Sequence, residues 1–406
     1  MRFPEFTEEW KRIRVSDLLD FYSTNSLSWE QLEYESNEPY NLHYGLIHVG
    51  LPTLVDLTKD KLPSIKEENV PKKYELCKEG DVAFADASED TNEVAKVVEF
   101  YNLDGKKVVC GLHTIHGRDN NKQTAKGFLG YCFSSTVFHN QIRRIAQGTK
   151  IYSINTRNFS EVFVGLPSKS EQHKIATLLR LIDEHISTQN KIIEKYESLI
   201  QAMCDTLIER ETQQVALSFS DFGQSYSGLS GKNAEDFGDG YPFITYMNVY
   251  QNQIIDSTDV GLVKIKETEQ QSVVRYGDIL FTLSSETPEE VGMGAVYLGE
   301  TYPLYLNSFC FGIHITDEAK IYSPFLAYYV SSQSFRKAVY PLAQGSTRFN
   351  LQKSDFMKKK FSFPMIEKQR KIYSILNTYS DKLIVEKQII GLLCSQKRYL
   401  LRQLFI

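Results

Sequence analysis

The sequence predicts an α+β fold with two similar β-rich lobes and an antiparallel coiled coil of two long helices, arranged as a pseudo-two-fold internal repeat. Three observations predict it. The second half of the chain repeats the first at a constant spacing, each repeat begins with short apolar runs between turn residues, and each ends in a long segment with a heptad pattern. The predicted boundaries are 1–166 and 214–363 for the lobes, and 167–213 and 364–406 for the helices.

The composition is that of an ordinary globular chain. Of 406 residues, 42% are hydrophobic and 24% are charged, which excludes a mostly disordered or low-complexity chain. No apolar run is long enough for a membrane span, and the opening residues lack the apolar core of a signal peptide. Six cysteines without a CxxC pair favour reduced thiols over disulfides or a zinc knuckle. We therefore expect a cytoplasmic protein.

The internal repeat has an offset of 197 residues and contains no gaps. Residues 80–84 (Gly-Asp-Val-Ala-Phe) fall on 277–281 (Gly-Asp-Ile-Leu-Phe). Further blocks follow in order: Phe-Leu-Gly-Tyr at 128–131, Ser-Ser followed by Phe138 at 134–138, Ala-Gln-Gly-Thr at 146–149, and Pro-x4-Gln-x-Lys-Ile at 167–175. The period is too long for a solenoid unit, so it predicts two duplicated lobes.

The first part of each repeat has the texture of a mixed, β-rich domain. Short apolar runs lie between Gly, Asn and Asp residues and predict strands at 108–110, 162–164 and 243–246. Apolar residues three and four apart predict short helices around 128–145 and 324–340.

The second part of each repeat predicts one long helix. Pro167 and Pro364 stand where a helix can begin; no Gly or Pro follows from 168 to 222, and only Gly391 interrupts 365–406. The seam positions alternate four and three residues apart, a mean of 3.5, which indicates a coiled-coil partner. The first seam is Ile175, Leu179, Ile182, Ile186, Gln189, Ile193, Tyr196, Ile200, Met203 and Leu207, and the second is the same set shifted by 197.

The two helices are predicted to pair with each other in antiparallel orientation, which puts the lobes at opposite ends. A contact of Ile175 with Leu404, rather than with Ile372, distinguishes this arrangement from a parallel pair. Each seam has a polar residue at one shared position, Gln189 or Glu386, and these two residues are expected in adjacent layers. The last helix carries eight Lys or Arg against three Asp or Glu. Two interpretations are open, a surface that faces DNA and a match to an acidic partner helix, and we favour the partner helix because the length and the seam already require one.

Two similar lobes on a rigid spacer suit a ligand with two separated sites, and duplex DNA is the commonest such ligand. Half-sites one helical turn apart lie about 34 Å from each other, within reach of a helix of roughly 50 Å. Segments 86–101 and 111–126 share little with their shifted counterparts, as two different half-sites require. The net charge of −5 argues mildly against DNA binding by this chain alone.

The ordered motifs resemble those of the specificity subunit of type I restriction–modification systems, over essentially the whole chain. They are the opening Arg2-Phe3-Pro4-Glu5-Phe6 with Trp10, the Gly-Asp strand of each half, the Gln-Gly-Ser/Thr turn, the Pro-x4-Gln-x-Lys-Ile helix entry, and the segment 228–249, which begins Gly-Leu-Ser-Gly-Lys. One departure lies at 148–152, where the first half has Gly-Thr-Lys-Ile-Tyr and the second has the more usual Gly-Ser-Thr-Arg-Phe.

The resemblance implies two target-recognition domains, each reading one half of a bipartite, asymmetric DNA sequence. It implies that the helices set the gap and dock two modification (methyltransferase) subunits, and that the assembly recruits restriction (motor-nuclease) subunits. Double-stranded DNA and these subunits are the expected partners, without a membrane. The chain itself is expected to be non-catalytic and to hold no cofactor, while S-adenosylmethionine, ATP and magnesium belong to the partner subunits.

The turns at 147–158 and 344–355 are the main candidates for DNA contact. Arg and Lys pair with guanine edges, and Asn and Gln with adenine edges. The alternative is that these are ordinary turn residues that pack each lobe onto its helix. The candidates are Lys150, Tyr152, Asn155, Arg157, Arg348, Asn350, Gln352 and Lys353.

A second group of candidates is basic. Arg118, Lys122 and Lys126 are expected in a polar loop that contacts phosphates, with an ordinary mobile loop as the alternative. Lys232, from the segment 228–249, is added to the DNA-contact candidates.

No motif predicts catalysis or a metal site. Asn37-Glu38-Pro39-Tyr40 lacks one proline of the Asn-Pro-Pro-Tyr signature of amino-methyltransferases, and Gly231-Lys232 is not followed by the Ser or Thr of a phosphate-binding loop. Cys110-x2-His113-x2-His116 has an unusual spacing for zinc and no evident fourth ligand, so a plain loop is expected. Two other classes stay open: a structural adaptor whose lobes bind protein, and an enzyme with fused recognition, which the missing motifs disfavour.

Overall fold

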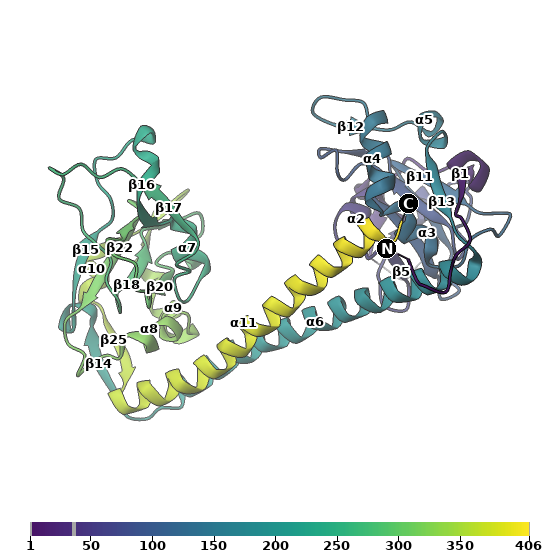
Figure 1. The fold of residues 1–406 in the computed structure, drawn as a ribbon. Coiled ribbons are helices and arrows are strands. Elements are labelled where there is room, and N and C mark those ends of the chain that lie inside the picture. Colours follow the sequence, from purple (N-terminus) through teal and green to yellow (C-terminus); the bar gives the residue numbers. More distant parts are fainter. Residues whose placement is uncertain (1, 35–37, 406) are drawn as a thin grey trace. The chain divides into compact units, whose positions relative to one another are not determined.

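The chain divides into two units, each of which combines a β-rich part with segments of both long helices. In the computed structural model, which describes residues 2–34 and 38–405, unit 1 comprises Met1–Lys191 with Gln388–Ile406, and unit 2 comprises Ile192–Lys387 (Figure 1). We call the β-rich part of unit 1 lobe 1 and that of unit 2 lobe 2.

Lobe 1 contains two main sheets, with the strand orders β2-β11-β7-β9-β5 and β10-β4-β6-β3. Small ladders join β1 to β13 and β12 to β8. The strands are β1 (Lys11–Arg14), β2 (Asp20–Tyr22), β3 (Leu32–Glu33), β4 (Tyr40–Leu42), β5 (Leu54–Asp56), β6 (Ser64–Ile65), β7 (Val82–Ala85), β8 (Ala87–Ser88), β9 (Val97–Asn102), β10 (Val108–Cys110), β11 (Thr114–Arg118), β12 (Tyr152–Ser153) and β13 (Phe163–Leu166). The helices are α1 (Val15–Leu18), α2 (Tyr44–His48), α3 (Phe128–Phe133), α4 (Thr136–Ile145) and α5 (Thr156–Ser160).

Lobe 2 repeats the central part of this plan. Its sheet β15-β22-β18-β20 corresponds to β2-β11-β7-β9, and its other groups are β17-β16-β21, β14-β25 and β19-β24-β23. The strands are β14 (Gln214–Ser218), β15 (Gly223–Ser227), β16 (Phe237–Ile244), β17 (Val260–Val263), β18 (Ile279–Thr282), β19 (Ser284–Ser285), β20 (Gly294–Val296), β21 (Tyr305–Leu306), β22 (Cys310–Ile315), β23 (Ala343–Gln344), β24 (Phe349–Leu351) and β25 (Lys360–Pro364). The helices are α7 (Tyr246–Gln251), α8 (Ser323–Tyr329), α9 (Gln333–Val339) and α10 (Lys353–Lys358).

The repeated Ser-Ser…Phe block divides each predicted short helical region into two helices. Ser135 accepts a hydrogen bond from the backbone N–H of Phe138 and so caps α4. Ser332 caps α9 through Phe335 in the same way. Both phenylalanines are buried in their lobes. Because a capping serine satisfies an otherwise unpaired helix N–H, this block of the repeat has a structural cause.

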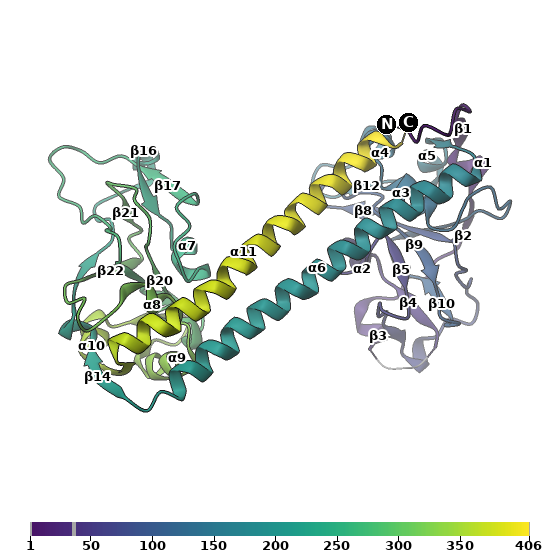
Figure 2. The same ribbon diagram turned by 60° about the horizontal axis from the view of Figure 1, so that its bottom comes forward.

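The long helices are α6 (Lys169–Glu209) and α11 (Ile366–Gln403). Within each unit they run side by side in both views (Figures 1 and 2), and their ends share the core of that unit's lobe. In unit 1, Ile175 and Leu179 lie in one apolar cluster with Leu400 and Leu404. The predicted contact of Ile175 with the end of α11, and hence the antiparallel orientation, is confirmed.

Three ion pairs within the units agree with this orientation. Lys397 lies 2.6 Å from Asp183 in unit 1, and in unit 2 Lys387 lies 2.7 Å from Glu197 and Lys368 lies 3.1 Å from Glu211. As the residue numbers of the acidic partners rise, those of the basic partners in α11 fall. This is the order expected of an antiparallel pair. Two basic residues of α11 thus face acidic residues of α6, and a third faces Glu211 just after the end of α6, which agrees with the favoured interpretation of an acidic partner helix. The adjacent layering of Gln189 and Glu386 stays a prediction.

The Pro-x4-Gln entry to each long helix is explained by a buried amide clamp. The side chain of Gln172 accepts a hydrogen bond from Ala125 N at 2.7 Å and donates to the carbonyl of the preceding proline at 2.9 Å. Gln369 makes the equivalent bonds, at 2.9 Å from Tyr322 N and at 2.8 Å to its own proline. Both glutamines are almost fully buried. Each one therefore fixes the first turn of a long helix to its lobe.

The opening motif of the chain is also structural. Arg2 makes two hydrogen bonds to the buried carboxylate of Glu171, at 2.8 and 2.7 Å. Trp10 packs edge-on against Phe405, with ring centroids 6.3 Å apart. Both ends of the described chain are thereby held to the core of unit 1. None of the described helices combines the length and apolarity needed to cross a membrane.

Replacing Gln369 with Leu should destabilise unit 2. The change removes the hydrogen-bond partners of the part-buried Tyr322 N–H and the buried Pro364 carbonyl, and each unsatisfied group costs about 1–3 kcal/mol. We expect a loss of roughly 2–5 kcal/mol in the free energy of unfolding, measured by denaturant titration. Gln388→Leu, on the exposed face of the same helix, is the matched control; equal losses in the two variants would contradict the clamp.

Candidate nucleic-acid interface

Each lobe presents one short hairpin, which follows α4 in lobe 1 and α9 in lobe 2. Hairpin 1 (Gln147–Ser153) is closed by paired backbone hydrogen bonds of 2.9 and 2.8 Å between its end residues. Hairpin 2 (Gln344–Asn350) is closed by the same pairing in register. β12 pairs with β8, and β24 pairs with β19, so each hairpin is attached to the segment that follows the Gly-Asp strand.

A glycine with a positive φ forms the turn of both hairpins. Gly148 has φ +137° and Gly345 has φ +138°. A Cβ at these positions would lie 1.9 Å from the carbonyl oxygen of Ile151 and 2.1 Å from that of Arg348. No other residue fits such a backbone without displacing it. This requirement explains why Gln-Gly-Ser/Thr occurs in both repeats.

The side chains on the two hairpins differ although the backbones match. Lys150 and Ile151 are exposed on hairpin 1, and the exposed Arg348 of hairpin 2 occupies the position of Ile151. The Arg348 guanidinium lies 5.9 Å from the centre of the exposed Phe309 ring. Asn350 is exposed where hairpin 1 has Ser153. The two lobes therefore offer different hydrogen-bonding groups from one common frame.

The remaining candidates from the two turns fall into two classes. Arg157, in α5, and Gln352, just before α10, are exposed. Tyr152 is half-buried against the core of lobe 1, Asn155 caps α5 by accepting a backbone hydrogen bond of 2.8 Å, and Lys353 is half-buried at the start of α10. The first class can reach a ligand directly, whereas the second helps to hold the turns; in this second class Asn155 is exposed, but its side-chain oxygen is used by the cap.

The prediction that Arg118 lies in a polar surface loop is wrong. This residue belongs to strand β11 and is 6% exposed. It binds both carboxylate oxygens of Asp81 at 2.8 Å and donates to Glu75 at 2.7 Å. Lys122 and Lys126 are exposed, as expected. Lys126 lies 2.8 Å from Glu79.

Arg118, Lys122 and Lys126 nevertheless line one cavity of lobe 1. Its other charged lining residues are Lys78, Lys169, Glu79, Asp81, Glu99 and Asp119. Positive and negative groups are interspersed, and no residue of hairpin 1 belongs to the lining. The structure therefore places the predicted phosphate-contact residues apart from the predicted base-contact turn.

Lys232 is also committed to the protein. Its side chain is 3% exposed and ion-paired with Glu269, and it donates to the carbonyl of Lys264 at 2.6 Å. This lysine ties the segment after Gly231 to the loop after β17.

The aspartate of the Gly-Asp motif is buried in both lobes but has different partners. Burial raises the pKa of Asp81, but hydrogen bonds from His116 and Arg118 outweigh it and hold the pKa below the usual value. Asp278 instead accepts from Tyr226 and His314, both at 2.8 Å. Burial raises its pKa, because these hydrogen bonds only partly offset the desolvation. Each aspartate anchors the strand that leads to the hairpin attachment.

Four arginines of lobe 1 were not among the predicted DNA-contact residues. Arg12 and Arg14 of β1 lie 4.3 and 5.6 Å from the ring centre of Phe163, and Arg144 lines a surface cavity with Arg12. Arg143 ends α4 beside it and is exposed. The paired arginines directly before the hairpin were the available signal.

The segment expected to be a plain loop is mostly strand. Cys110 ends β10, and His116 lies in β11. The exposed His113 Nδ1 lies 3.1 Å from Asp86. Asn37 of the incomplete methyltransferase-like motif lies outside the described residues. The expectation that the chain holds no cofactor stays a prediction.

Known proteins of one family resemble this chain in sequence. The family model described as Type I restriction modification DNA specificity domain matches residues 7–198 and 221–393. The chain is 23% identical over 185 residues to the EcoKI type I restriction enzyme specificity subunit of Escherichia coli (strain K12); this alignment covers 41% of the chain and only 39% of that protein. It is 22% identical over 410 residues to a Methanocaldococcus jannaschii protein named for the MjaX type I restriction enzyme specificity subunit, covering 95% and 90%.

Solved structures share the fold. The crystal structure of a type I restriction–modification S subunit from M. genitalium matches with a TM-score of 0.56 at 17% identity, covering 100% of this chain and 97% of that one. A chain from a study of complex assembly and conformational transition of the type I R-M system matches with a TM-score of 0.60 at 15% identity, covering 98% and 97%.

Replacing Gly345 with Ala should disrupt hairpin 2. The new Cβ would overlap the carbonyl oxygen of Arg348, at 2.1 Å, so the turn must open. We expect faster hydrogen exchange across 343–351, measured by mass spectrometry. Gly391→Ala, in α11 with open space around it, is the control and should leave that segment unchanged. Unaltered exchange in Gly345→Ala would show that the turn tolerates a side chain.

Glu99 should make the stability of lobe 1 depend on pH. Its buried carboxylate accepts hydrogen bonds from Gly127 N and Gly130 N, at 2.5 and 2.8 Å, and burial raises its pKa from 4.5 to about 7. The folded chain thus binds this proton more tightly than the unfolded chain, so stability falls as pH rises from 4.5 to about 7 and then levels off.

In Glu99→Gln, the loss of stability with rising pH should be smaller than in the wild type. The measurement is the thermal unfolding midpoint on both sides of pH 7. Glu30→Gln, at an exposed glutamate of the same lobe, should keep the wild-type profile. A profile that is the same in wild type and Glu99→Gln would rule out titration of this carboxyl as the cause.

Proposed function

The chain belongs to the family of type I restriction–modification DNA specificity domains, and from this premise we propose that it is the DNA sequence-recognition subunit of a type I restriction–modification complex. Each lobe reads one half of a bipartite, asymmetric site. α6 and α11 set the unspecified gap between the halves. The subunit works in the cytoplasm, where the host DNA is modified.

One observation carries this proposal: the two hairpins have the same backbone but different exposed side chains. Lys150 and Ile151 in lobe 1 correspond to Thr347 and Arg348 in lobe 2. A frame kept by Gly148 and Gly345 holds each set in position. Two different half-sites require this combination, because base edges are distinguished by the groups that meet them.

The proposed contacts follow from exposure. Lys150, Arg157, Arg348, Asn350 and Gln352 read bases, and Lys122, Lys126, Arg12 and Arg144 contact phosphates, which position the protein without specifying sequence. Tyr152 and Lys353, which are half-buried, support the turns, and so does the exposed Asn155, whose side-chain oxygen caps α5. Arg118 and Lys232 serve the fold, because their charges are already paired inside the lobes.

The helices also dock two modification subunits, and the complex recruits restriction subunits. Support comes from apolar side chains that α11 leaves exposed, a feature typical of protein-binding surfaces; they include Ile384, Val385 and Leu392. The acidic net charge of −5 fits a complex in which partner subunits supply much of the phosphate contact. This chain is non-catalytic, and S-adenosylmethionine, ATP and magnesium act in the partners.

Methylome sequencing tests the proposal directly. A host that expresses this chain with its modification subunit should gain methylation at one bipartite motif with a fixed gap. A host with the modification subunit alone is the control and should gain none. Methylation at a continuous motif, or none at all, would refute bipartite recognition and favour a protein-binding adaptor.

Arg348→Ala should weaken and relax recognition of one half-site only. Loss of a base contact costs about 1–3 kcal/mol, or roughly 5- to 150-fold in affinity. The measurement is binding of the complex to duplexes with each half-site altered in turn. Lys337→Ala, at an exposed lysine in α9 of the same lobe, is the control. Unchanged preference at every position would remove Arg348 from the reading residues.

A further inference from the structure

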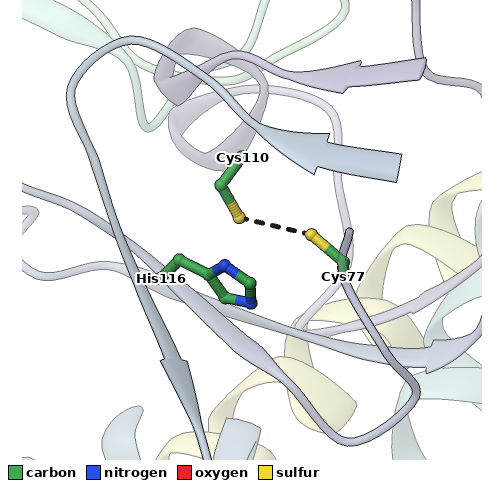
Figure 3. Close-up of side chains that lie close together, drawn as sticks. All are labelled: Cys77, Cys110 and His116. Carbon is green, nitrogen blue, oxygen red and sulfur yellow. Dashed lines mark hydrogen bonds between the residues drawn. The ribbon is translucent and has the colours of Figure 1, made fainter. Parts of the chain in front are cut away.

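Lobe 1 contains a buried cluster of two thiols and one imidazole that DNA recognition does not use. The sulfur atoms of Cys77 and Cys110 and a ring nitrogen of His116 all lie within 4.8 Å of one another (Figure 3). The three residues are 6%, 2% and 0% exposed. Groups that bind soft metal ions are thus gathered inside the lobe, away from bulk solvent.

The three residues come from separate segments of the chain. Cys77 lies in the connector before β7, and its backbone N–H donates to Val108 O at 2.8 Å. Cys110 ends β10 in the smaller sheet, and His116 lies in β11 of the larger sheet. An ion held by all three would cross-link the connector and both sheets of lobe 1.

The histidine is oriented as a metal ligand. Its Nε2 lies 2.7 Å from Asp81 Oδ2, and Arg118 holds the same carboxylate. Nε2 therefore carries the proton that Asp81 accepts, and Nδ1 presents a lone pair. This Nδ1 is buried without a hydrogen-bond partner, which is unfavourable for a polar atom unless a ligand binds it. A carboxylate behind the distal nitrogen is the usual arrangement of metal-binding histidines.

The sulfur spacing and charge fit zinc. The two sulfur atoms lie 3.5 Å apart, close to the roughly 3.8 Å that tetrahedral zinc with Zn–S bonds of about 2.3 Å requires. Thiolate and imidazole are ligands that zinc prefers over hard oxygen-binding cations. Two thiolates also balance the two charges of the ion, so the buried site is neutral, which avoids the cost of an uncompensated charge.

We propose that lobe 1 binds one structural Zn²⁺ through Cys77 Sγ, Cys110 Sγ and His116 Nδ1, with Asp81 orienting the histidine. Cys110 also lines a surface cavity of lobe 1. The fourth position is taken by water or another small ligand. This site goes beyond the proposed function and does not depend on it.

The sequence motif Cys110-x2-His113-x2-His116 did not identify the cluster, because it contains His113, which is not a member, and lacks Cys77, which is. The ring of His113 turns to Asp86 at the surface, and the additional ligand, Cys77, lies 33 residues upstream of Cys110. Lobe 2 does not repeat the set. Val274 stands in place of Cys77 and Asn307 in place of Cys110, and the pairing of β22 with β18 puts Gly312 in place of His116.

Metal analysis of the purified full-length chain tests the proposal. Plasma mass spectrometry should find about one zinc per chain after dialysis against metal-free buffer. Cys77→Ala and Cys110→Ala should lower this content at least tenfold. Cys132→Ala, at a buried cysteine of the same lobe outside the cluster, is the matched control and should keep the zinc.

A second measurement needs no variant and so covers the case in which the substitutions prevent folding. Wild-type chain loaded with Co²⁺ in place of zinc should show the visible bands of tetrahedral cobalt and thiolate-to-cobalt charge transfer. Chelation should lower the thermal unfolding midpoint. Less than a tenth of a metal ion per chain with no Co²⁺ spectrum, full zinc content in the cysteine variants, or a Cys77–Cys110 disulfide in thiol-blocked protein would each overturn the proposal.

Discussion

The structure depends on one constraint: neither lobe has a complete apolar core without both long helices. Ile175 and Leu179 of α6 are buried with Leu400 and Leu404 of α11 in unit 1, while Ile372 and Leu376 of α11 are buried with Ile200 and Cys204 of α6 in unit 2. Each fully buried aliphatic side chain contributes about 1.5–3 kcal/mol, so the sharing is strongly stabilising. The first turn of each helix is fixed to the lobe that precedes it by a buried glutamine, and its last turns complete the core of the other unit.

Those parts of the fold that depend on local or periodic chemistry could be predicted from the sequence. A heptad seam needs only residue spacing, and it identified α6 and α11 as paired helices. Their antiparallel orientation was predicted from connectivity, because a β-rich lobe precedes each helix. The Ser-Ser and Gln-Gly blocks were visible as repeats, because a cap at Ser135 or a turn at Gly148 depends on a few adjacent residues. What the repeat could not reveal was the reason for each block, since that reason lies in atomic contacts such as the glutamine clamp.

Features that depend on pairing between distant segments could not be predicted. Arg118 looked like a loop residue that contacts phosphate, but its partners Asp81 and Glu75 lie 37 and 43 residues away. Lys232 is neutralised by Glu269, 37 residues downstream. The position of a charged side chain depends on the position of its oppositely charged partner. That position is fixed only when the sheets assemble. The hairpin residues are free of this problem, because their exposure follows from a local turn.

The two lobes show which parts of a recognition domain can change together. The buried aspartate of the Gly-Asp strand remains in both, yet it binds Arg118 and His116 in lobe 1 and Tyr226 and His314 in lobe 2. A buried carboxylate without partners is costly, so these partners must be exchanged as complete sets. His116 is available to face Cys77 and Cys110 only because its other nitrogen belongs to such a set. Interior chemistry has therefore diverged between the lobes within a shared central sheet, just as the side chains of their exposed hairpins have.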